Sequence, residues 1–126
     1  MEPEDRRFTT ITPILRMFDE AKAKEFYGGY LGFKVDWEHR FEPELPLYMQ
    51  VSAGACVLHL SEHYGDCSPG AALRLEAADV RLLHAELSAR NYPFARPGLE
   101  ETPWGTLELR VTDPFGNRLV FYEALK

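Results

Sequence analysis

Residues 103–123 read PWGTLELRVTDPFGNRLVFYE, and this stretch decides the fold. Apolar and polar residues alternate over residues 107–111, which is the pattern of a strand with one buried face. DPFGN, residues 113–117, is typical of a turn, because proline fixes φ while glycine and asparagine tolerate positive φ. Residues 119–122 are apolar and predict a second strand that pairs back on the first. The stretch therefore predicts a β-hairpin with Trp104 at the mouth of a sheet.

The first half of the chain is predicted to form a strand, a helix and three more strands. Residues 8–17 are β-prone, although Pro13 limits that strand to an edge, a kink or a hinge. Asp19 is a good N-cap for the helix, and Gly32 is a suitable stop. The apolar residues at helical spacing are Ala23, Phe26, Tyr27 and Tyr30. The three strands are predicted over Phe33–His39, Leu47–Ser52 and Ala55–Ser61, the last two joined by a tight turn at Gly54.

The second half repeats this order after a loop. Asp79 is the expected N-cap of a helix with an apolar stripe, and Asn91 is its expected C-cap. The stripe consists of Val80, Leu83 and Leu87. The strands are predicted over Ala71–Glu76, over Phe94–Arg96 and in the hairpin of residues 105–123. We therefore expect an α+β fold in one domain, residues 1–126, made of two tandem βαβββ modules (about 8–62 and 70–124) with mixed sheets curved around a cleft.

The bulk properties indicate a globular protein. The chain has 126 residues, of which 45% are hydrophobic and 27% charged, and it contains no apolar run long enough for a membrane span. Residues 1–7 are polar, so we expect no secretory signal there. Cys56 is expected in the core and Cys67 in a loop, so the two cysteines predict no disulfide framework and favour the cytoplasm.

The net charge of −6 argues against nucleic acid as a partner, because no basic stripe is present to neutralise phosphates. It favours a neutral or cationic partner. The plain alternative is that mild acidity only keeps the protein in solution.

Two motifs carry a family resemblance: Tyr30-Leu31-Gly32-Phe33 after the first helix, and the DPFGN turn. With the order of elements, they resemble the vicinal oxygen chelate superfamily over about residues 8–124. That group includes glyoxalase I, extradiol dioxygenases, fosfomycin-resistance enzymes and bleomycin-resistance proteins. The chain looks most like the last of these, which lack a catalytic metal and hold the drug in a groove between two subunits. The resemblance implies a homodimer, and residues 12–15 resemble a first strand that is exchanged between protomers.

The resemblance also allows a test for a metal site. The ligand positions of the family's enzymes fall on Thr12, His59, Ala72 and Val120. Two of these side chains have no donor atom and threonine is a poor ligand, so we expect no metal and no other cofactor. His59 and His63 would lie about 13 Å apart on an extended strand and could not share one ion. His59 is instead expected to line the cleft or to be a hydrogen-bonded core residue.

Two tryptophans fall at positions where the bleomycin-resistance proteins clamp the flat bithiazole of the drug: Trp37 and Trp104. Aromatic residues also dominate protein cores, so both could be packing residues. Indole faces stack on planar rings and attract cations. Asp36 and Glu101 lie beside them in the sequence and would attract a cationic ligand.

These features predict a metal-free homodimer that sequesters a planar, cationic glycopeptide antibiotic of the bleomycin type, without catalysis and without contact with nucleic acid or membrane. The predicted ligand-binding residues are Asp36, Trp37, Tyr48, His59, Glu62, Glu101 and Trp104. The alternative is a metal-dependent glyoxalase or dioxygenase-type enzyme, in which His59 and a shifted carboxylate such as Glu62 or Glu123 would bind the ion.

Overall fold

The computed structural model describes residues 7–125 of the chain, which form two four-stranded mixed sheets and two helical segments. The elements of the first half are β1 (Ile14–Arg16), α1 (Glu20–Ala23), η2 (Lys24–Tyr30), β2 (Lys34–His39), β3 (Tyr48–Ala53) and β4 (Cys56–Ser61). Those of the second half are β5 (Ala72–Glu76), α2 (Val80–Ala89), β6 (Leu99–Glu101), β7 (Thr106–Thr112) and β8 (Arg118–Ala124). The predicted α+β fold class is confirmed.

The two sheets have the same topology. Their strand orders are β1-β4-β3-β2 and β5-β8-β7-β6, and in each the first strand of the half pairs in parallel with the last. The remaining pairs are antiparallel. β4 and β5 line a common pocket of about 260 Å³, so the sheets meet there. β2 and β6 are therefore the outer edges of the pair of sheets.

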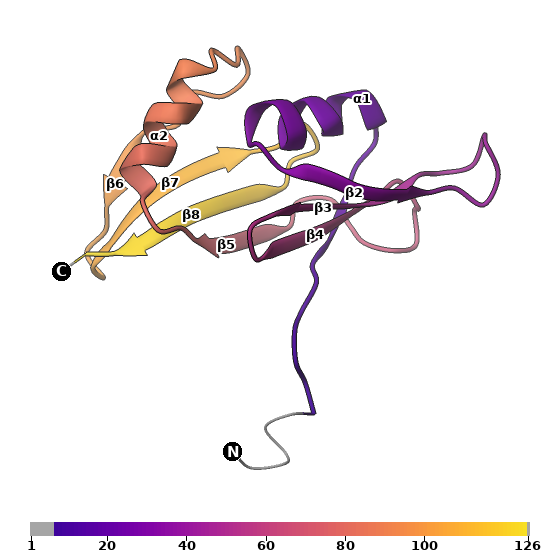
Figure 1. Cartoon of the computed structure of the whole chain (residues 1–126), viewed down its shortest axis with the longest axis horizontal. Helices are drawn as coiled ribbons and strands as arrows, with labels where there is room; N and C mark the ends of the chain where they lie inside the picture. The colour runs from indigo at the N-terminus through magenta and orange to yellow at the C-terminus, as the bar shows by residue number, and fades with distance from the viewer. Residues whose placement is uncertain (1–6, 126) are drawn as a thin grey trace.

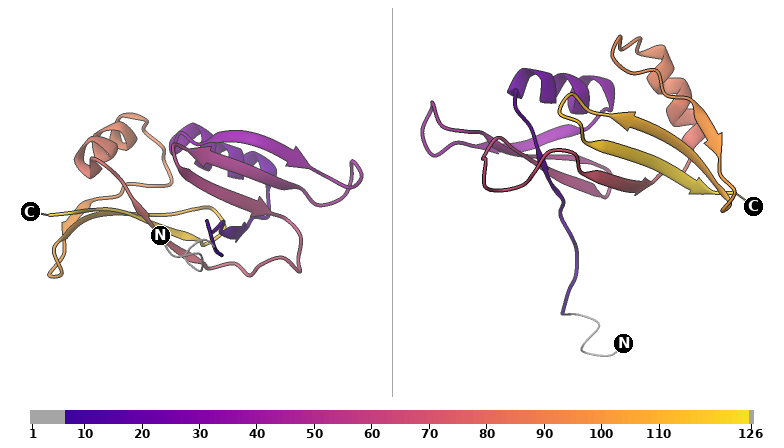
Figure 2. Two further views of the ribbon diagram at one scale, coloured as in Figure 1. Left: turned by 60° about the horizontal axis from the view of Figure 1, so that its bottom comes forward. Right: turned by 180° about the vertical axis from the view of Figure 1, so that it is seen from behind.

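Both helices lie on the same side of the two sheets (Figures 1 and 2). The core is the layer between helices and sheets, and alternate residues of each strand point into it. In β3 and β4 these are Met49, Val51, Leu58 and Leu60, and in β7 they are Leu107, Leu109 and Val111. The other alternate residues occupy the opposite side, which we call the helix-free face.

The first helix begins at the predicted cap, where Asp19 accepts a hydrogen bond from the backbone of Lys22 (2.9 Å). It then widens into the π-helical segment η2, which contains Gly28 and Gly29. Glycine lacks a Cβ and tolerates such irregular backbone. The predicted apolar stripe is buried in full, and Gly32 ends the segment with a φ of 83°.

Two predicted strands are wrong in extent or place. The first strand covers only Ile14–Arg16, although the same register would set residues 11–13 beside residues 56–58 of β4; Pro13 has no backbone N–H to donate, and the ladder ends there. Residues 7–12 instead run as an exposed arm on the side opposite the helices (Figure 1), whereas the carbonyl oxygen of Pro13 still accepts a hydrogen bond from the backbone of His59 in β4 (2.9 Å). The short strand predicted over Phe94–Arg96 lies at Leu99–Glu101, because Pro93 and Pro97 bracket the earlier segment and remove two backbone donors.

The carboxylate of Asp113 joins the two halves from within the core. It is buried and accepts hydrogen bonds from the backbone of Phe115 and Asn117 (2.8 Å each), so it closes the β7–β8 turn. It also accepts from the hydroxyl of Tyr27 in η2 (2.6 Å) and from the amide of Asn117 (2.8 Å). That amide donates in turn to the carbonyl oxygen of Arg16 in β1 (2.9 Å). One acid therefore ties the second sheet to two elements of the first half.

Within residues 7–125, no helix is long and apolar enough to cross a membrane. The expectation about a secretory signal concerns residues 1–7, of which residues 1–6 lie outside the described part of the chain.

Replacing Asp113 by alanine should destabilise the fold by about 3 kcal/mol, because several buried donors would lose their acceptor. Tyr27→Phe should cost about 1 kcal/mol, since Asp113 keeps its other partners. Urea unfolding followed by circular dichroism measures both variants. Equal losses in the two variants would show that the carboxylate does not act as the shared acceptor.

Candidate functional site

A bulge in β2 places two successive side chains on the helix-free face. Val35 pairs with Val51 and Trp37 pairs with Gln50, so Asp36 is the extra residue of its strand. Strict alternation would send Asp36 and Trp37 to opposite faces, whereas a bulge turns both to one side. The neighbouring strands add Tyr48 and His59 to the same face.

Three rings form a cluster there: Trp37, Tyr48 and His59, which we call the ring cluster. The indole of Trp37 stacks on the phenol of Tyr48, with ring centroids 5.9 Å apart and planes 10° apart. The imidazole of His59 meets both rings edge-on, at 5.3 Å from Trp37 and 5.1 Å from Tyr48. Trp37 is 42% exposed, so one side of the stack is open to a further flat ring.

A chain of hydrogen bonds fixes these rings. Nδ1 of His59 lies 2.6 Å from the hydroxyl of Tyr48, and Nε2 lies 3.0 Å from Oε1 of Gln50. The amide nitrogen of Gln50 donates to Asp36 (3.0 Å), which leaves its oxygen as the acceptor for Nε2–H. His59 is therefore the neutral Nε2–H tautomer, and Tyr48 donates to Nδ1. Burial lowers the pKa of His59 below 6.5 and agrees with this neutral form.

The second tryptophan is held by a tight turn between β6 and β7. The backbone of Gly105 donates to the carbonyl oxygen of Thr102 (3.2 Å), and Gly105 has a φ of 89°. Pro103 takes the second position of this turn, which its ring geometry favours. Trp104 follows it and remains 63% exposed on the helix-free face.

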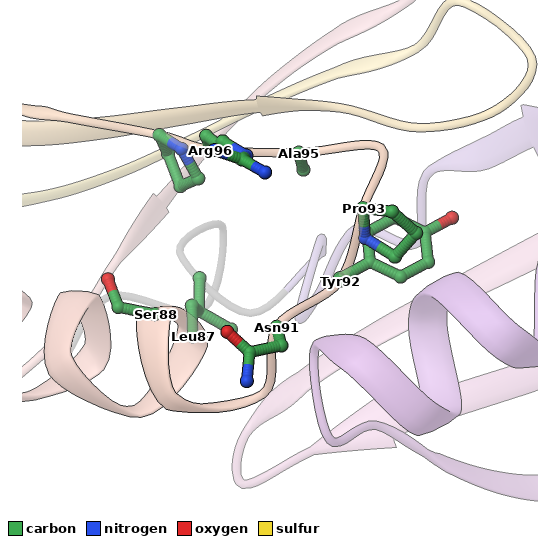
Figure 3. Close-up of a pocket in the computed structure, with 8 residues that line it drawn as sticks. Leu87, Ser88, Asn91, Tyr92, Pro93, Ala95 and Arg96 are labelled. Atoms are coloured by element: carbon green, nitrogen blue, oxygen red, sulfur yellow. The ribbon is translucent and has the colours of Figure 1, made fainter.

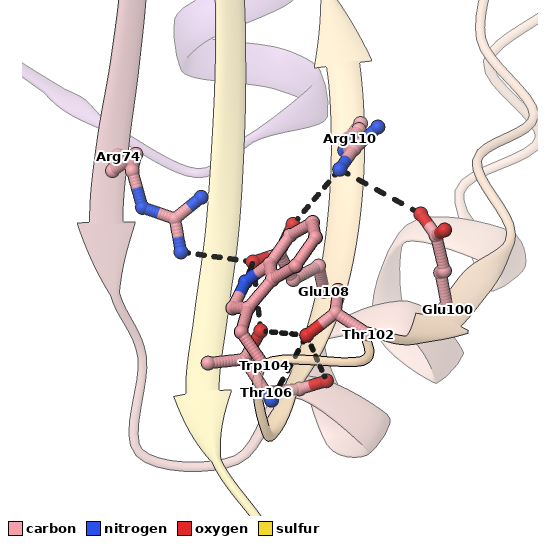
Figure 4. Close-up of polar contacts among 7 residues, drawn as sticks. All are labelled: Arg74, Glu100, Thr102, Trp104, Thr106, Glu108 and Arg110. Atoms are coloured by element: carbon pink, nitrogen blue, oxygen red, sulfur yellow. Dashed lines mark hydrogen bonds and ion pairs between the residues drawn. The ribbon is translucent and has the colours of Figure 1, made fainter.

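Beneath the indole lies a buried carboxylate, Glu108 of β7, whose side chain is 0% exposed (Figure 4). Its oxygens accept hydrogen bonds from Arg74 (2.8 Å), Arg110 (3.1 Å), the Thr106 hydroxyl (2.8 Å) and the indole N–H of Trp104 (3.3 Å). These donors, led by Arg74, lower the pKa of Glu108 to about 2. A buried carboxylate with this many donors is a fixed anchor, and we call these five residues the carboxylate cluster.

The structure places the seven predicted site residues at four locations. Asp36, Trp37, Tyr48 and His59 lie together, whereas Trp104 belongs to the carboxylate cluster on the other sheet. Within residues 7–125 we find no ring contact or hydrogen bond that joins the two clusters.

The other two predicted acids lie elsewhere. Glu62 accepts a hydrogen bond from the backbone of Leu47 (2.8 Å) and so closes the end of β3. Glu101 pairs with Arg81 of α2 (3.6 Å), on the helix side of the sheet. Its neighbour Glu100 is the residue in register with Glu108, 3.7 Å from Arg110.

Sequence reasoning missed Glu108, Arg74 and Arg110. A signal for the first was available: Thr106, Glu108 and Arg110 alternate along one predicted strand and must share a face.

The donor set does not fit a metal ion of the kind that the family's enzymes use. Among the four carried-over positions, His59 has the one strong ligand atom, and both of its ring nitrogens are engaged by Tyr48 and Gln50. Residues 7–125 contain no group of three or more histidine, cysteine or acidic side chains placed to hold an ion.

A surface pocket of about 400 Å³ lies at the C-terminal end of α2 (Figure 3). Its walls are formed by Leu87, Ser88, Asn91, Tyr92, Pro93, Ala95, Arg96 and Pro97. Arg96 is the one charged side chain in its walls, which contain no acid–base pair. The pocket shares no residue with either cluster. We therefore place the candidate site on the helix-free face.

Comparison with known families gives one match, to the family described as "Glyoxalase superfamily protein", over residues 4–126. The chain belongs to the glyoxalase superfamily. This confirms the resemblance that the two motifs indicated. No curated protein sequence matches the chain.

Several solved structures share the fold. A bleomycin-binding protein complexed with bleomycin is 19% identical with a TM-score of 0.71, and the match covers 92% of this chain and 98% of that one. TnmS3, an antibiotic binding protein from Streptomyces sp. CB03234, is 23% identical with a TM-score of 0.70, covering 94% and 98%. The bleomycin-binding protein of Streptomyces verticillus, complexed with copper(II)-bleomycin, is 28% identical with a TM-score of 0.67, covering 91% and 95%. The chain thus shares its fold with proteins that bind antibiotics.

The tautomer of His59 can be measured directly. Nitrogen-15 NMR of the imidazole should show the Nε2–H form at about pH 7 and a titration below pH 6.5, because Nδ1 accepts from Tyr48 and burial disfavours the charged ring. Tyr48→Phe removes that donor and should lower the population of the Nε2–H tautomer. A resting Nδ1–H form in the unaltered protein would contradict the hydrogen-bond chain.

Glu108 should make stability depend on pH in acid. Its folded-state pKa is lowered from 4.5 to about 2, so its contribution is present above 4.5 and is lost as the pH falls toward 2. Urea midpoints measured from about pH 6 to about pH 2 should therefore fall less steeply in Glu108→Gln than in the unaltered protein. Glu86→Gln on α2 changes the same charge at an exposed position and should leave the slope unchanged. Parallel curves for Glu108→Gln and the unaltered protein would exclude this role.

Proposed function

We propose that the chain is a binding protein that sequesters a planar antibiotic of the bleomycin class by stacking and charge, without catalysis. The observation that carries the proposal is the pair of half-exposed tryptophans, each held in one orientation on the helix-free face. The relatives that bind bleomycin or another antibiotic support it, since the chain covers nearly their whole length.

The ring cluster supports a flat guest. The plane of Trp37 is already set by Tyr48, so a ligand ring can stack on it without ordering the indole first. Side chains that are ordered before binding lose less conformational entropy on association, which strengthens affinity. Both ring nitrogens of His59 are engaged, by Tyr48 and by Gln50, and the amide nitrogen of Gln50 donates to Asp36, so the cluster offers mainly ring faces.

The charge at this cluster suits a cationic group on the ligand. Asp36 lies beside the rings, and its contacts with Gln50, Ser52 and Lys34 lower its pKa, which keeps it ionised. A cationic tail placed there would meet a carboxylate and indole faces together. The net charge of −6 would also raise the rate at which a cationic drug arrives.

A groove between two copies of the chain would join the two tryptophans. In one chain Trp37 lies on β2 and Trp104 beside β6, the two outer edges of the pair of sheets. A symmetric dimer repeats each surface twice and can set the ring cluster of one protomer against the carboxylate cluster of its partner. The exposed arm, with Phe8 at 83% and Ile11 at 86% exposure, supplies apolar surface that a partner could cover.

Bleomycin added to the protein should quench tryptophan fluorescence with saturation. Trp37→Ala and Trp104→Ala should each weaken binding by about tenfold or more, because each removes a stacking face. Phe94→Ala is the control, since Phe94 is 77% exposed and lies on the loop after α2.

Light scattering of the same samples tests the dimer. Unchanged emission at millimolar drug would refute the proposed ligand class, and a monomer that binds bleomycin would refute the composite groove alone.

A further inference from the structure

The carboxylate cluster presents to solvent a different chemistry from the one at its centre. The side chain of Glu108 is 0% exposed, whereas those of Arg74 and Arg110 are 49% and 55% exposed. Trp104 lies between the two guanidinium groups, over the carboxylate (Figure 4). A molecule that approaches this face therefore meets an indole and two cations, with one exposed carboxylate, Glu100, beside Arg110, and it does not reach the anion of Glu108 below them.

Some hydrogen-bond donors of the carboxylate cluster are engaged by Glu108, and others remain available to a ligand. Oε2 of Glu108 accepts from Arg74, Thr106 and Trp104, and Oε1 accepts from Arg110. The indole N–H is thereby engaged, so Trp104 offers a guest its ring face. Each guanidinium has five N–H donors and gives one nitrogen to Glu108, which leaves further donors at the exposed end.

The two arginines are also held in place. The guanidinium carbon of Arg74 lies 4.5 Å from the centre of the Tyr122 ring, so this side chain is fixed from two sides. Arg110 lies between Glu108 and Glu100, whose oxygens are 3.1 Å and 3.7 Å away. Guanidinium groups with restricted rotamers recognise oxygen anions at a lower entropic cost than free ones.

We propose that Trp104, Arg74 and Arg110 form a subsite for a planar ring that carries an anionic oxygen group, and that Glu108 is its positioning residue. The indole stacks on the ring, and the guanidinium donors bind a carboxylate, sulfonate or phosphate oxygen. A cation at the same place would meet two exposed guanidinium groups against one exposed carboxylate, that of Glu100, and would gain no contact with the covered Glu108.

This inference deepens the proposed function and rests on it, because it assigns a chemical preference to one half of the same groove. The two halves then differ in sign: Asp36 serves a cationic end of the ligand, and the arginines serve an anionic or oxygen-rich end. The preferred ligand is accordingly dipolar, with its two ends separated by a flat system of rings.

The experiment compares two probes of equal ring size, a naphthalenesulfonate and a naphthylmethylammonium, on the unaltered full-length protein. The chain has two tryptophans, so a proton–nitrogen correlation spectrum contains two indole N–H signals, which Trp37→Phe and Trp104→Phe assign. The sulfonate should shift the Trp104 signal and bind about fivefold or more tightly than the ammonium at this signal. Equal or tighter binding of the ammonium there, or no shift with the sulfonate, would overturn the subsite.

Three charge variants test the named residues. Arg110→Gln should weaken the sulfonate by about fivefold, and Glu100→Gln should strengthen it, because Glu100 competes for Arg110. Arg81→Gln is the matched control: it removes one positive charge from α2, where Arg81 is 63% exposed and pairs with Glu101. If Arg81→Gln lowered the affinity for the sulfonate as much as Arg110→Gln, the effect would come from net charge alone, and the subsite would be rejected.

In the probe-free spectrum of each variant, an indole signal of Trp37 at the same position as in the unaltered protein shows that the variant is folded. If Arg110→Gln does not fold, the probe comparison and Glu100→Gln still decide. If bleomycin fails to bind while the sulfonate shifts Trp104, the proposed function is wrong and the anion preference stands. If bleomycin binds and the sulfonate does not, the proposed function stands and the subsite is rejected.

Discussion

The arrangement of the two sheets depends on one buried carboxylate, Asp113. A charge inside a protein is tolerated when donors replace the water that it loses, and here two backbone N–H groups, an amide and a phenol do so. Burial raises the pKa of Tyr27, which keeps its hydroxyl protonated and able to donate. Because Asn117 extends the network to β1, the turn between β7 and β8 cannot move without moving the first half. This network, with the contacts of Arg90 and Tyr92 to the first helix, holds the two halves of the helix-free face in one relative position.

Local chemistry and the pairing of strands within hairpins were predictable from the sequence, whereas pairing between distant strands was not. The turns at residues 102–105 and 113–116 share a proline at the second position and a glycine at the fourth, and both adopt the same hydrogen bond with φ near 90° at glycine. The caps at Asp19 and Asp79 also followed from a few neighbouring residues. The extent of the first strand depends instead on where its ladder with β4 ends, and β4 lies more than forty positions along the chain. The sequence marked Pro13 as a limit of this strand, but the prediction still began the strand at residue 8.

The candidate site shows the same division. Aromatic residues at Trp37, Tyr48 and His59 were visible in the sequence, but their joint face depends on a bulge that alternation does not reveal. Glu108 was predicted as the polar side of a strand, yet its burial arises because the indole of Trp104 folds back over it. The two neighbouring acids of β6 lie on opposite faces of the sheet. Glu101 lies on the helix side and pairs with Arg81, whereas Glu100 shares a face with Glu108. Register is a property of the paired strands, and a single residue of error reverses the face.

The unequal chemistry of the two sheets bears on why a second copy of the chain would be needed. The ring cluster brings a carboxylate, Asp36, to its stack, and the carboxylate cluster brings exposed guanidinium groups to Trp104. Because these surfaces lie at β2 and β6, the outer edges, a ligand bound within one chain would contact one chemistry at a time. Pairing unlike surfaces across a two-fold axis gives two equivalent grooves, each with stacking faces at both walls and opposite charge at its two ends. Specificity for a dipolar flat molecule would then arise from the assembly, since a purely cationic or purely anionic ring would leave one wall unmatched.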